Sequence, residues 1–114
     1  MLRVANAIAL TVSAAHLEGV GSADGRLPHG TGLEVRLMGE VGHAAARQGL
    51  SLDEANSMIL SLLKRYEHVF EKEGGNPGVP FDSAYDMTTL QPVKEWQAMY
   101  DDVRTELADL GLFL

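Results

Sequence analysis

The apolar residues of this chain recur every three or four positions over most of its length, a period that predicts amphipathic helices. The expected helices cover residues 31–48, a stretch that follows Ser51 and reaches Phe70, and residues 92–110. Two of them begin with capping boxes, Thr31-Gly-Leu-Glu34 and Ser51-Leu-Asp-Glu54, in which each terminal side chain bonds the backbone of the other residue. Gly49 is expected to end the first of these helices, and Pro92 suits the first position of the last helix.

Residues 2–15 are apolar on nearly every side, with five alanines among larger aliphatic residues. This composition predicts a helix that other protein must cover on most sides. From His16 to Val20 the chain is too short for a helix and is closed by Gly19 and Gly21, which predicts one buried strand. A single strand leaves its backbone groups unpaired, so its partners are expected in another chain or in protein that this chain lacks.

The remaining segments are expected to be irregular. Glycine and proline predict loops at 22–30 and 73–80, and residues 81–90 are expected to be extended. Gly39 and Gly42 lie inside a predicted helix and suggest that another backbone approaches closely. The expected fold class is therefore mainly α, with about four helices plus one short strand, in a single unit over residues 1–114.

Composition narrows the classes of function. The chain has 114 residues, no cysteine and a formal charge of −7, and residues 81–114 carry seven acidic and two basic side chains. No basic face is therefore available for nucleic acid. The lack of cysteine excludes disulfides and thiol nucleophiles and fits a reducing cytoplasm, which is the expected location. The first apolar run is interrupted by Asn6 and is too short for a bilayer, so neither a secretory signal nor a membrane is expected.

Candidate chemistry gathers in a glycine-rich stretch that begins near His16. On a strand, His16 and Glu18 share a face and are candidates for polar groups in a pocket, with hydrogen bonding at a loop junction as the alternative. Further along, a helix start offers backbone amides that attract anions. The candidate substrate-binding residues there are His29, Gly30, Thr31 and Gly32. A solvated loop histidine is the alternative for His29.

The remaining glycines, histidines and methionines give weaker indications of function. The glycines lack G-x-G-x-x-G spacing and no P-loop lysine follows them, which disfavours a nucleotide fold. His43 and Arg47 share a helix face without a third ligand nearby, so no metal site is expected. Met38, Met58 and Met99 lie on apolar stripes and are expected in the core.

Three groups of residues carry a family resemblance that covers almost the whole chain. They are His29-Gly-Thr-Gly-Leu-Glu-Val-Arg-Leu-Met-Gly-Glu-Val-Gly-His-Ala44, then Leu52-Asp-Glu-Ala-Asn56 with Leu62-Leu-Lys-Arg-Tyr-Glu67, and finally Ala84-Tyr-Asp-Met-Thr-Thr-Leu-Gln-Pro92 with Trp96-Gln-Ala-Met-Tyr100. In these residues the chain resembles the C-terminal part of the monomethylamine methyltransferases.

The resemblance implies the end of a (β/α)8 barrel. That family transfers a methyl group from monomethylamine to the reduced cobalt of a partner corrinoid protein and uses a pyrrolysine in the barrel. Residues 2–15 would be a late barrel helix, residues 16–20 the last strand and residues 31–48 the helix after it. Such barrels need about 250 residues. No position here corresponds to the pyrrolysine or its surrounding acids, so the chain is expected to bind no cofactor and to be inactive alone, with His16 and Glu18 at the pocket rim.

Two hypotheses follow from these observations. The first is a C-terminal fragment or truncated homologue of a methylamine:corrinoid protein methyltransferase, whose partners are the corrinoid protein and the remaining barrel. The alternative is a small helical interaction protein without catalytic activity, which self-associates through residues 2–15 and the apolar stripe within 93–110.

Overall fold

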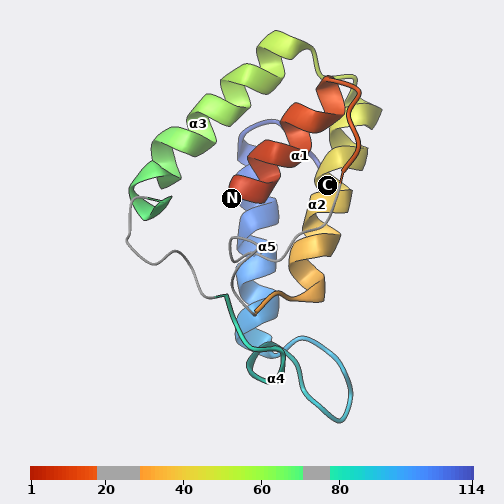
Figure 1. Cartoon of the computed structure of the whole chain (residues 1–114), viewed down its shortest axis with the longest axis vertical. Coiled ribbons are helices and arrows are strands. Elements are labelled where there is room, and N and C mark those ends of the chain that lie inside the picture. The colour runs from red at the N-terminus through yellow and green to blue at the C-terminus, as the bar shows by residue number, and fades with distance from the viewer. Residues whose placement is uncertain (18–28, 71–77) are drawn as a thin grey trace.

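The computed structural model describes residues 1–17, 29–70 and 78–114. Its elements are α1 (Leu2–Val12), α2 (Gly32–Gln48), α3 (Leu52–Phe70), α4 (Phe81–Ala84) and α5 (Lys94–Asp109) (Figure 1). These described ranges contain no strand, and one isolated antiparallel bridge joins Tyr85 to Pro92. The prediction of a mainly helical chain is confirmed.

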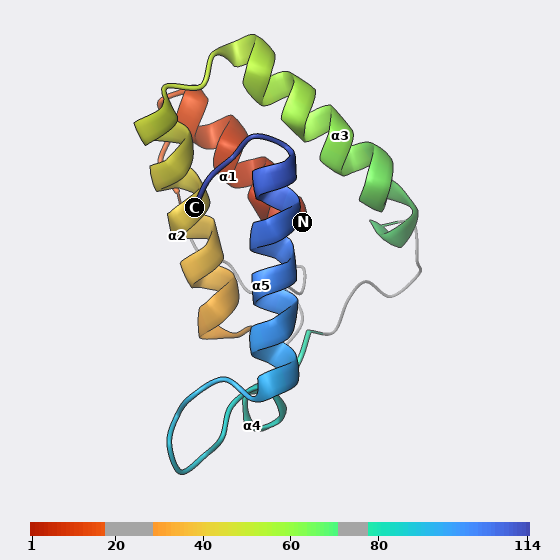
Figure 2. The same cartoon turned by 180° about the vertical axis from the view of Figure 1, so that it is seen from behind.

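Helices α2 and α5 lie side by side and run in the same direction, as both views show (Figures 1 and 2). Two hydrogen bonds join these helices. The Trp96 indole donates to the Thr31 hydroxyl near the start of both helices, and the Tyr100 hydroxyl donates to the Glu40 carboxylate further along. Helix α1 packs against α2 and α3. Helix α4 and the loop after it project from the end where α2 and α5 begin.

The main core forms where α1, α2, α3, α5 and the end of the chain meet. Its largest fully buried side chains are Ile8, Leu62, Leu107, Leu112, Val4 and Val41. In α2, the core residues Met38, Val41, Ala44 and Ala45 follow helical spacing and put one face of the helix toward the core, as the sequence period predicts. Burial of each such side chain contributes roughly 1.5–3 kcal/mol to the stability of the fold. This core therefore holds the helices that contribute to it in place.

Local signals set the ends of the middle helices as predicted. In the first capping box, the Glu34 carboxylate accepts the Thr31 N–H at 2.7 Å. In the second, the Glu54 carboxylate accepts the Ser51 N–H at 2.8 Å and the Ser51 hydroxyl accepts the Glu54 N–H at 3.3 Å. Gly49, at φ 63°, ends α2 in the left-handed region, which glycine adopts without a steric penalty.

Helix α1 is shorter than the predicted span of residues 2–15, because it ends at Val12. Ala14 takes φ 55°, which turns the chain back and brings Leu17 onto the core. Leu17 lies over Gly42 of α2, where an added Cβ would overlap its side chain. The backbone approach predicted at both glycines was therefore wrong: side chains are the nearest neighbours at Gly42, and an added Cβ at Gly39 would meet nothing within 4 Å.

Three further expectations need correction. The strand predicted for residues 16–20 is not seen at His16 and Leu17, and its other residues lie outside the described ranges. The segment expected to be extended over residues 81–90 opens with the helical turn α4, because Pro80 presets the turn and accepts the amides of residues 83 and 84. Pro92 precedes α5 by two residues, since it pairs with Tyr85 instead of starting the helix.

The chain ends in a segment held on the main core. Gly111, at φ 91°, reverses the chain after α5, and Leu112 becomes fully buried. Two side chains at the end of α2 hold this segment: Gln48 donates to the Gly111 carbonyl at 2.8 Å, and Arg47 donates to the Phe113 carbonyl at 2.8 Å. Among the described helices, none is long and apolar enough to cross a membrane.

Candidate functional site

The predicted substrate-binding residues lie where the start of α2 meets α4 and α5. Thr31 is only 3% exposed. Its hydroxyl accepts the Trp96 indole N–H at 3.1 Å and bonds the Glu34 carboxylate at 3.1 Å. The hydroxyl therefore joins the cap of α2 to α5. The capping box could be predicted from four adjacent residues. The bond from Trp96 could not, because the tryptophan lies 65 positions away in the sequence.

A second long-range bond closes the same helix end. The Tyr85 hydroxyl accepts the buried N–H of Leu33 at 2.9 Å, one of the amides that a helix start leaves without a partner in its own helix. Gly32 lies so close that an added Cβ would be 3.2 Å from the Tyr85 hydroxyl oxygen. Tyr85 therefore buries its ring and caps α2 with its hydroxyl.

These polar contacts rest on a second, smaller core. It consists of Leu33, Ala84, Tyr85 and Tyr100, with Leu37, Val79 and Trp96 packed against it. Phe81 stacks on the Tyr85 ring with centroids 4.6 Å apart. Because the second core takes residues from α2, α4 and α5, it holds the cap residues in one arrangement.

His29 and Gly30 lie on the outer side of this helix start. Gly30 is exposed and His29 is half-buried. Gly78, at φ 75°, lies against His29, and an added Cβ there would overlap the His29 carbonyl oxygen. The close approach at Gly78 requires glycine on both conformational and steric grounds. The contact ties the segment before α4 to the segment before α2.

The structure does not bring all of the predicted site residues together. His16 is exposed and precedes Leu17, which lies over Gly42. Gly42 comes ten positions after Gly32, which corresponds to about 15 Å along the axis of α2. Glu18, the other rim candidate, lies outside the described residues. His16 is therefore placed apart from the cluster at His29 to Gly32.

A polar network between α2 and α5 was not foreseen from the sequence. The Glu40 carboxylate accepts the Tyr100 hydroxyl and, at 2.7 Å, the Arg36 Nε–H. The guanidinium carbons of Arg36 and Arg104 lie 5.6 Å and 5.9 Å from the centre of the Tyr100 ring, close enough for cation–π attraction. Residues 36 and 40 are one helical turn apart, a spacing that predicts an ion pair. The bond from Tyr100 could not be predicted, because the tyrosine lies 60 positions away in the sequence.

Burial and hydrogen bonding change the acidity of this network. Burial, reinforced by the bond to Glu40, raises the pKa of Tyr100 to about 12. Burial also acts to raise the pKa of Glu40, but hydrogen bonds from Tyr100 and Arg36 outweigh it and leave that pKa below its usual value. At neutral pH the network thus holds a neutral tyrosine and an ionised glutamate, so it has no free acid or base poised for catalysis.

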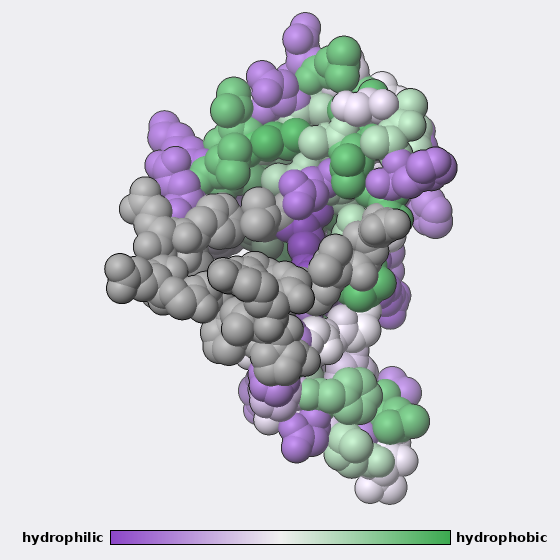
Figure 3. All heavy atoms as spheres, in the orientation of Figure 1, coloured by the Kyte–Doolittle hydropathy of each residue, from purple (hydrophilic) through white to green (hydrophobic). Residues whose placement is uncertain are grey.

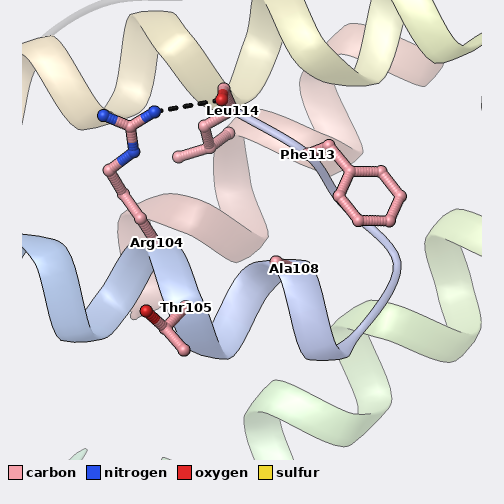
Figure 4. Close-up of a pocket in the computed structure, with 5 residues that line it drawn as sticks. All are labelled: Arg104, Thr105, Ala108, Phe113 and Leu114. Atoms are coloured by element: carbon pink, nitrogen blue, oxygen red, sulfur yellow. Dashed lines mark hydrogen bonds between the residues drawn. The ribbon is translucent and has the colours of Figure 1, made fainter.

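One pocket of about 260 Å³ opens beside the end of the chain (Figure 4). Its lining residues are Arg104, Thr105, Ala108, Phe113 and Leu114. The Arg104 Nη2 donates to the Leu114 carbonyl at 3.0 Å across it. The pocket has no side-chain carboxylate or histidine in its lining and lies away from the start of α2, so its side chains offer no acid–base pair for a reaction.

Metal-ligand geometry is also lacking in the part of the chain that the structure describes, where no group of three His, Asp or Glu side chains could hold an ion. His43 is exposed, and Arg47 is engaged with the Phe113 carbonyl. What the described residues offer is a helix start braced by Thr31, Tyr85 and Trp96. Such an arrangement can position a loop or present a surface, but it supplies no nucleophile or general base.

Comparison with known proteins places the chain in the family that the sequence resembles. The family model of monomethylamine methyltransferase MtmB matches residues 1–112. Monomethylamine methyltransferases of Methanosarcina mazei, Methanosarcina barkeri and Methanosarcina acetivorans are each 38% identical to this chain over 97 residues, which is 84% of this chain and 20% of each relative. The chain thus spans about a fifth of the length of the curated relatives it matches. No solved structure matches it.

Proposed function

This chain belongs to the monomethylamine methyltransferase family MtmB, and we propose that it forms the C-terminal portion of such an enzyme and is inactive alone. The observation that carries the proposal is coverage: the family model spans nearly all of this chain, while the chain spans a fifth of its relatives. The absence of a catalytic constellation among the described residues supports it, because the reacting groups then belong to the other four fifths.

The reaction proposed for the whole protein is methyl transfer from monomethylamine to the reduced cobalt of a corrinoid carried by a partner protein in the cytoplasm. In that assembly α1 is a late helix of a (β/α)8 barrel, residues 16–20 lead to its rim, and α2 follows the last strand. Catalytic loops of such barrels follow the strands at one face. His16, Glu18 and His29 to Gly32 are therefore proposed as rim residues, and the cofactor is bound elsewhere.

The braced start of α2 supports a structural contribution to that rim. Thr31, Tyr85 and Trp96 fix the point where α2 begins, and His29 and Gly30 precede it on the outer side. A loop whose end is fixed in this way holds its neighbouring groups in register with the rest of a site. The chain's own role is then to position groups at the edge of the pocket.

Complementation tests the proposal. The chain is mixed with the Methanosarcina mazei enzyme shortened by the stretch that it matches, and methyl transfer from monomethylamine to cob(I)alamin is followed by absorbance. We expect transfer only in the mixture, with each part inactive alone. Methyl transfer by this chain alone would refute the proposal that it is inactive by itself. Failure of the two parts to associate would refute the proposal that they complement each other.

The second candidate function is self-association without catalysis. Residues 2–15, one of the two surfaces expected to mediate it, bury Val4, Ala7 and Ile8 within this chain, so the exposed apolar side chains of α3 favour it instead. Leu52 and Leu60 on α3 are 66% and 56% exposed. Sedimentation of the chain alone separates the candidates. A stable, folded homo-oligomer that does not bind the shortened enzyme favours self-association. A monomeric or aggregating chain that becomes soluble and folded on binding the shortened enzyme favours the C-terminal portion of a methyltransferase.

A further inference from the structure

The projecting end of the molecule carries an apolar surface on a short segment. Phe81, Met87 and Leu90 are 46%, 59% and 61% exposed, although they lie within ten residues of one another. Figure 3 shows apolar side chains gathered over α4 and the loop after it, at the end away from α3. These three residues define what we call the apolar tip. Large side chains gathered in this way are typical of a contact surface.

The loop that carries the apolar tip is held in one conformation. The Asp86 carboxylate accepts the amides of Thr88 and Thr89, each at 2.8 Å. The Asp86 N–H donates to the Gln91 carbonyl at 2.9 Å, and the Leu90 N–H donates to the Asp86 carbonyl at 2.8 Å. These backbone bonds hold the pKa of Asp86 below its usual value. The loop therefore needs little ordering when it binds a partner.

Leu90 is the residue that folding alone does not explain. Its φ of 56° lies in the left-handed region, where leucine is disfavoured and glycine or asparagine fits better. The side chain is mostly exposed, so it makes no compensating core contact. A strained backbone that presents an exposed leucine is expected where the side chain has a contact to make outside the chain.

The apolar tip is also fixed to the body of the molecule. Phe81 stacks on Tyr85, which is buried in the second core and bonded to Leu33 of α2. The bridge between Tyr85 and Pro92 closes the base of the loop. Tyr85 thus joins the apolar tip to the start of α2, where the candidate rim residues lie.

Charge indicates which partner covers the apolar tip. Asp82 and Asp86 are exposed within the tip sequence and Glu95 is exposed shortly after it, with Lys94 as the nearest basic residue along the sequence, and the whole chain carries −7. Two copies brought together here would repel each other. An apolar depression with basic residues at its border is complementary, and like-charge repulsion makes a second copy the poorer occupant.

We propose that the apolar tip is the docking element by which this chain binds the remaining four fifths of a monomethylamine methyltransferase, inserting Met87 and Leu90 into an apolar depression of that part. The inference rests on the proposed function, because that function supplies the missing four fifths. It adds the surface and the residues that make the contact.

The test compares two double variants in binding to the shortened Methanosarcina mazei enzyme. In the first, Met87→Gln and Leu90→Asn remove both apolar side chains of the loop, and asparagine suits the left-handed backbone of residue 90. The control, Leu52→Gln and Leu60→Gln, removes two equally exposed side chains from α3. Dissociation constants are measured by calorimetry. We expect the tip variant to bind about tenfold or more weakly and the control to bind like the original chain.

The outcomes separate the inference from the function on which it rests. If the original chain does not bind the shortened enzyme, the proposed function is refuted and the docking element with it. If the original chain and the tip variant bind equally, only the docking element is refuted. A homodimer of the original chain that the tip variant abolishes in sedimentation would identify a second copy as the occupant. Circular dichroism and urea unfolding of both variants show whether a loss of binding reflects unfolding.

Discussion

Replacing Tyr85 by phenylalanine removes a single oxygen atom from the second core and tests how α2 is capped. The Tyr85 hydroxyl accepts the Leu33 N–H at 2.9 Å, and both residues are buried. In the Tyr85→Phe variant the ring keeps its packing and its stack with Phe81, but the amide loses its acceptor. The variant therefore isolates the cost of one unsatisfied donor at a helix start.

The expected loss is about 1–3 kcal/mol, the range for a buried donor left without a partner. A matched control is Tyr66→Phe. The Tyr66 hydroxyl donates to Glu106 at 2.6 Å, but that carboxylate also accepts Arg65 at 2.7 Å and the site is only partly buried. Because Glu106 keeps a charged partner and water can reach it, we expect the control to lose only about 0.5–1.5 kcal/mol.

Urea unfolding followed by circular dichroism measures both losses. The midpoint should fall more for Tyr85→Phe than for Tyr66→Phe, with an unchanged slope, because the area exposed on unfolding is nearly the same. Equal losses, or a smaller loss for Tyr85→Phe, would refute the argument that the hydroxyl caps α2. Hydrogen exchange gives a second readout, since the Leu33 amide should exchange faster in Tyr85→Phe.

Gly32→Ala refines the same test. An added Cβ at residue 32 would lie 3.2 Å from the Tyr85 hydroxyl oxygen, a crowded distance. In the Tyr85→Phe background that oxygen is gone, so alanine should be better tolerated there than in the original chain. The two substitutions are therefore expected to couple by about 0.5 kcal/mol or more. Additive effects would indicate that the hydroxyl moves away from residue 32 at little cost.

The remaining predictions concern helix packing, pH and burial of charge. Gly42→Ala should cost about 1–3 kcal/mol in urea unfolding because its Cβ overlaps the side chain that follows α1, whereas Gly39→Ala should stabilise by up to about 1 kcal/mol. Stability should fall as pH rises from 10 to about 12, because folded Tyr100 holds its proton more tightly than the unfolded chain does. Tyr100→Phe should reduce that fall without abolishing it, because the bond to Glu106 also raises the pKa of Tyr66. Arg3→Met should raise the unfolding free energy by about 1 kcal/mol, since two buried guanidinium nitrogens lack partners among the described residues; a loss would show that the charge is needed.

The helices were predictable because their signals are local. A capping box needs four residues, and the apolar period of α3 is repeated over five turns, so neither depends on distant parts of the chain. The end of α1 was not predictable in this way. Its alanines favour helix through residue 15, but packing of Leu17 on Gly42 requires a turn, and Ala14 takes a left-handed conformation.

The candidate site shows the same division between local and distant information. Glycines and a cap identified the start of α2, yet its bracing comes from Tyr85 and Trp96, which are more than 50 positions away. The prediction that Met99 lies in the core was wrong, because this side chain is 57% exposed. It neighbours Tyr100 in sequence, but only the tyrosine lies on the face of α5 that turns toward α2.

The bracing also limits how a ligand can use the start of α2. The Leu33 amide is taken by Tyr85, and the Thr31 amide is taken by Glu34. A bound anion would have to displace the hydroxyl or share this end with the Glu34 carboxylate, which opposes it. Contact with a ligand therefore falls to the outer residues, half-buried His29 and exposed Gly30. Within a larger enzyme, the start of α2 would fix the position of these residues while the rest of the protein supplies the charge.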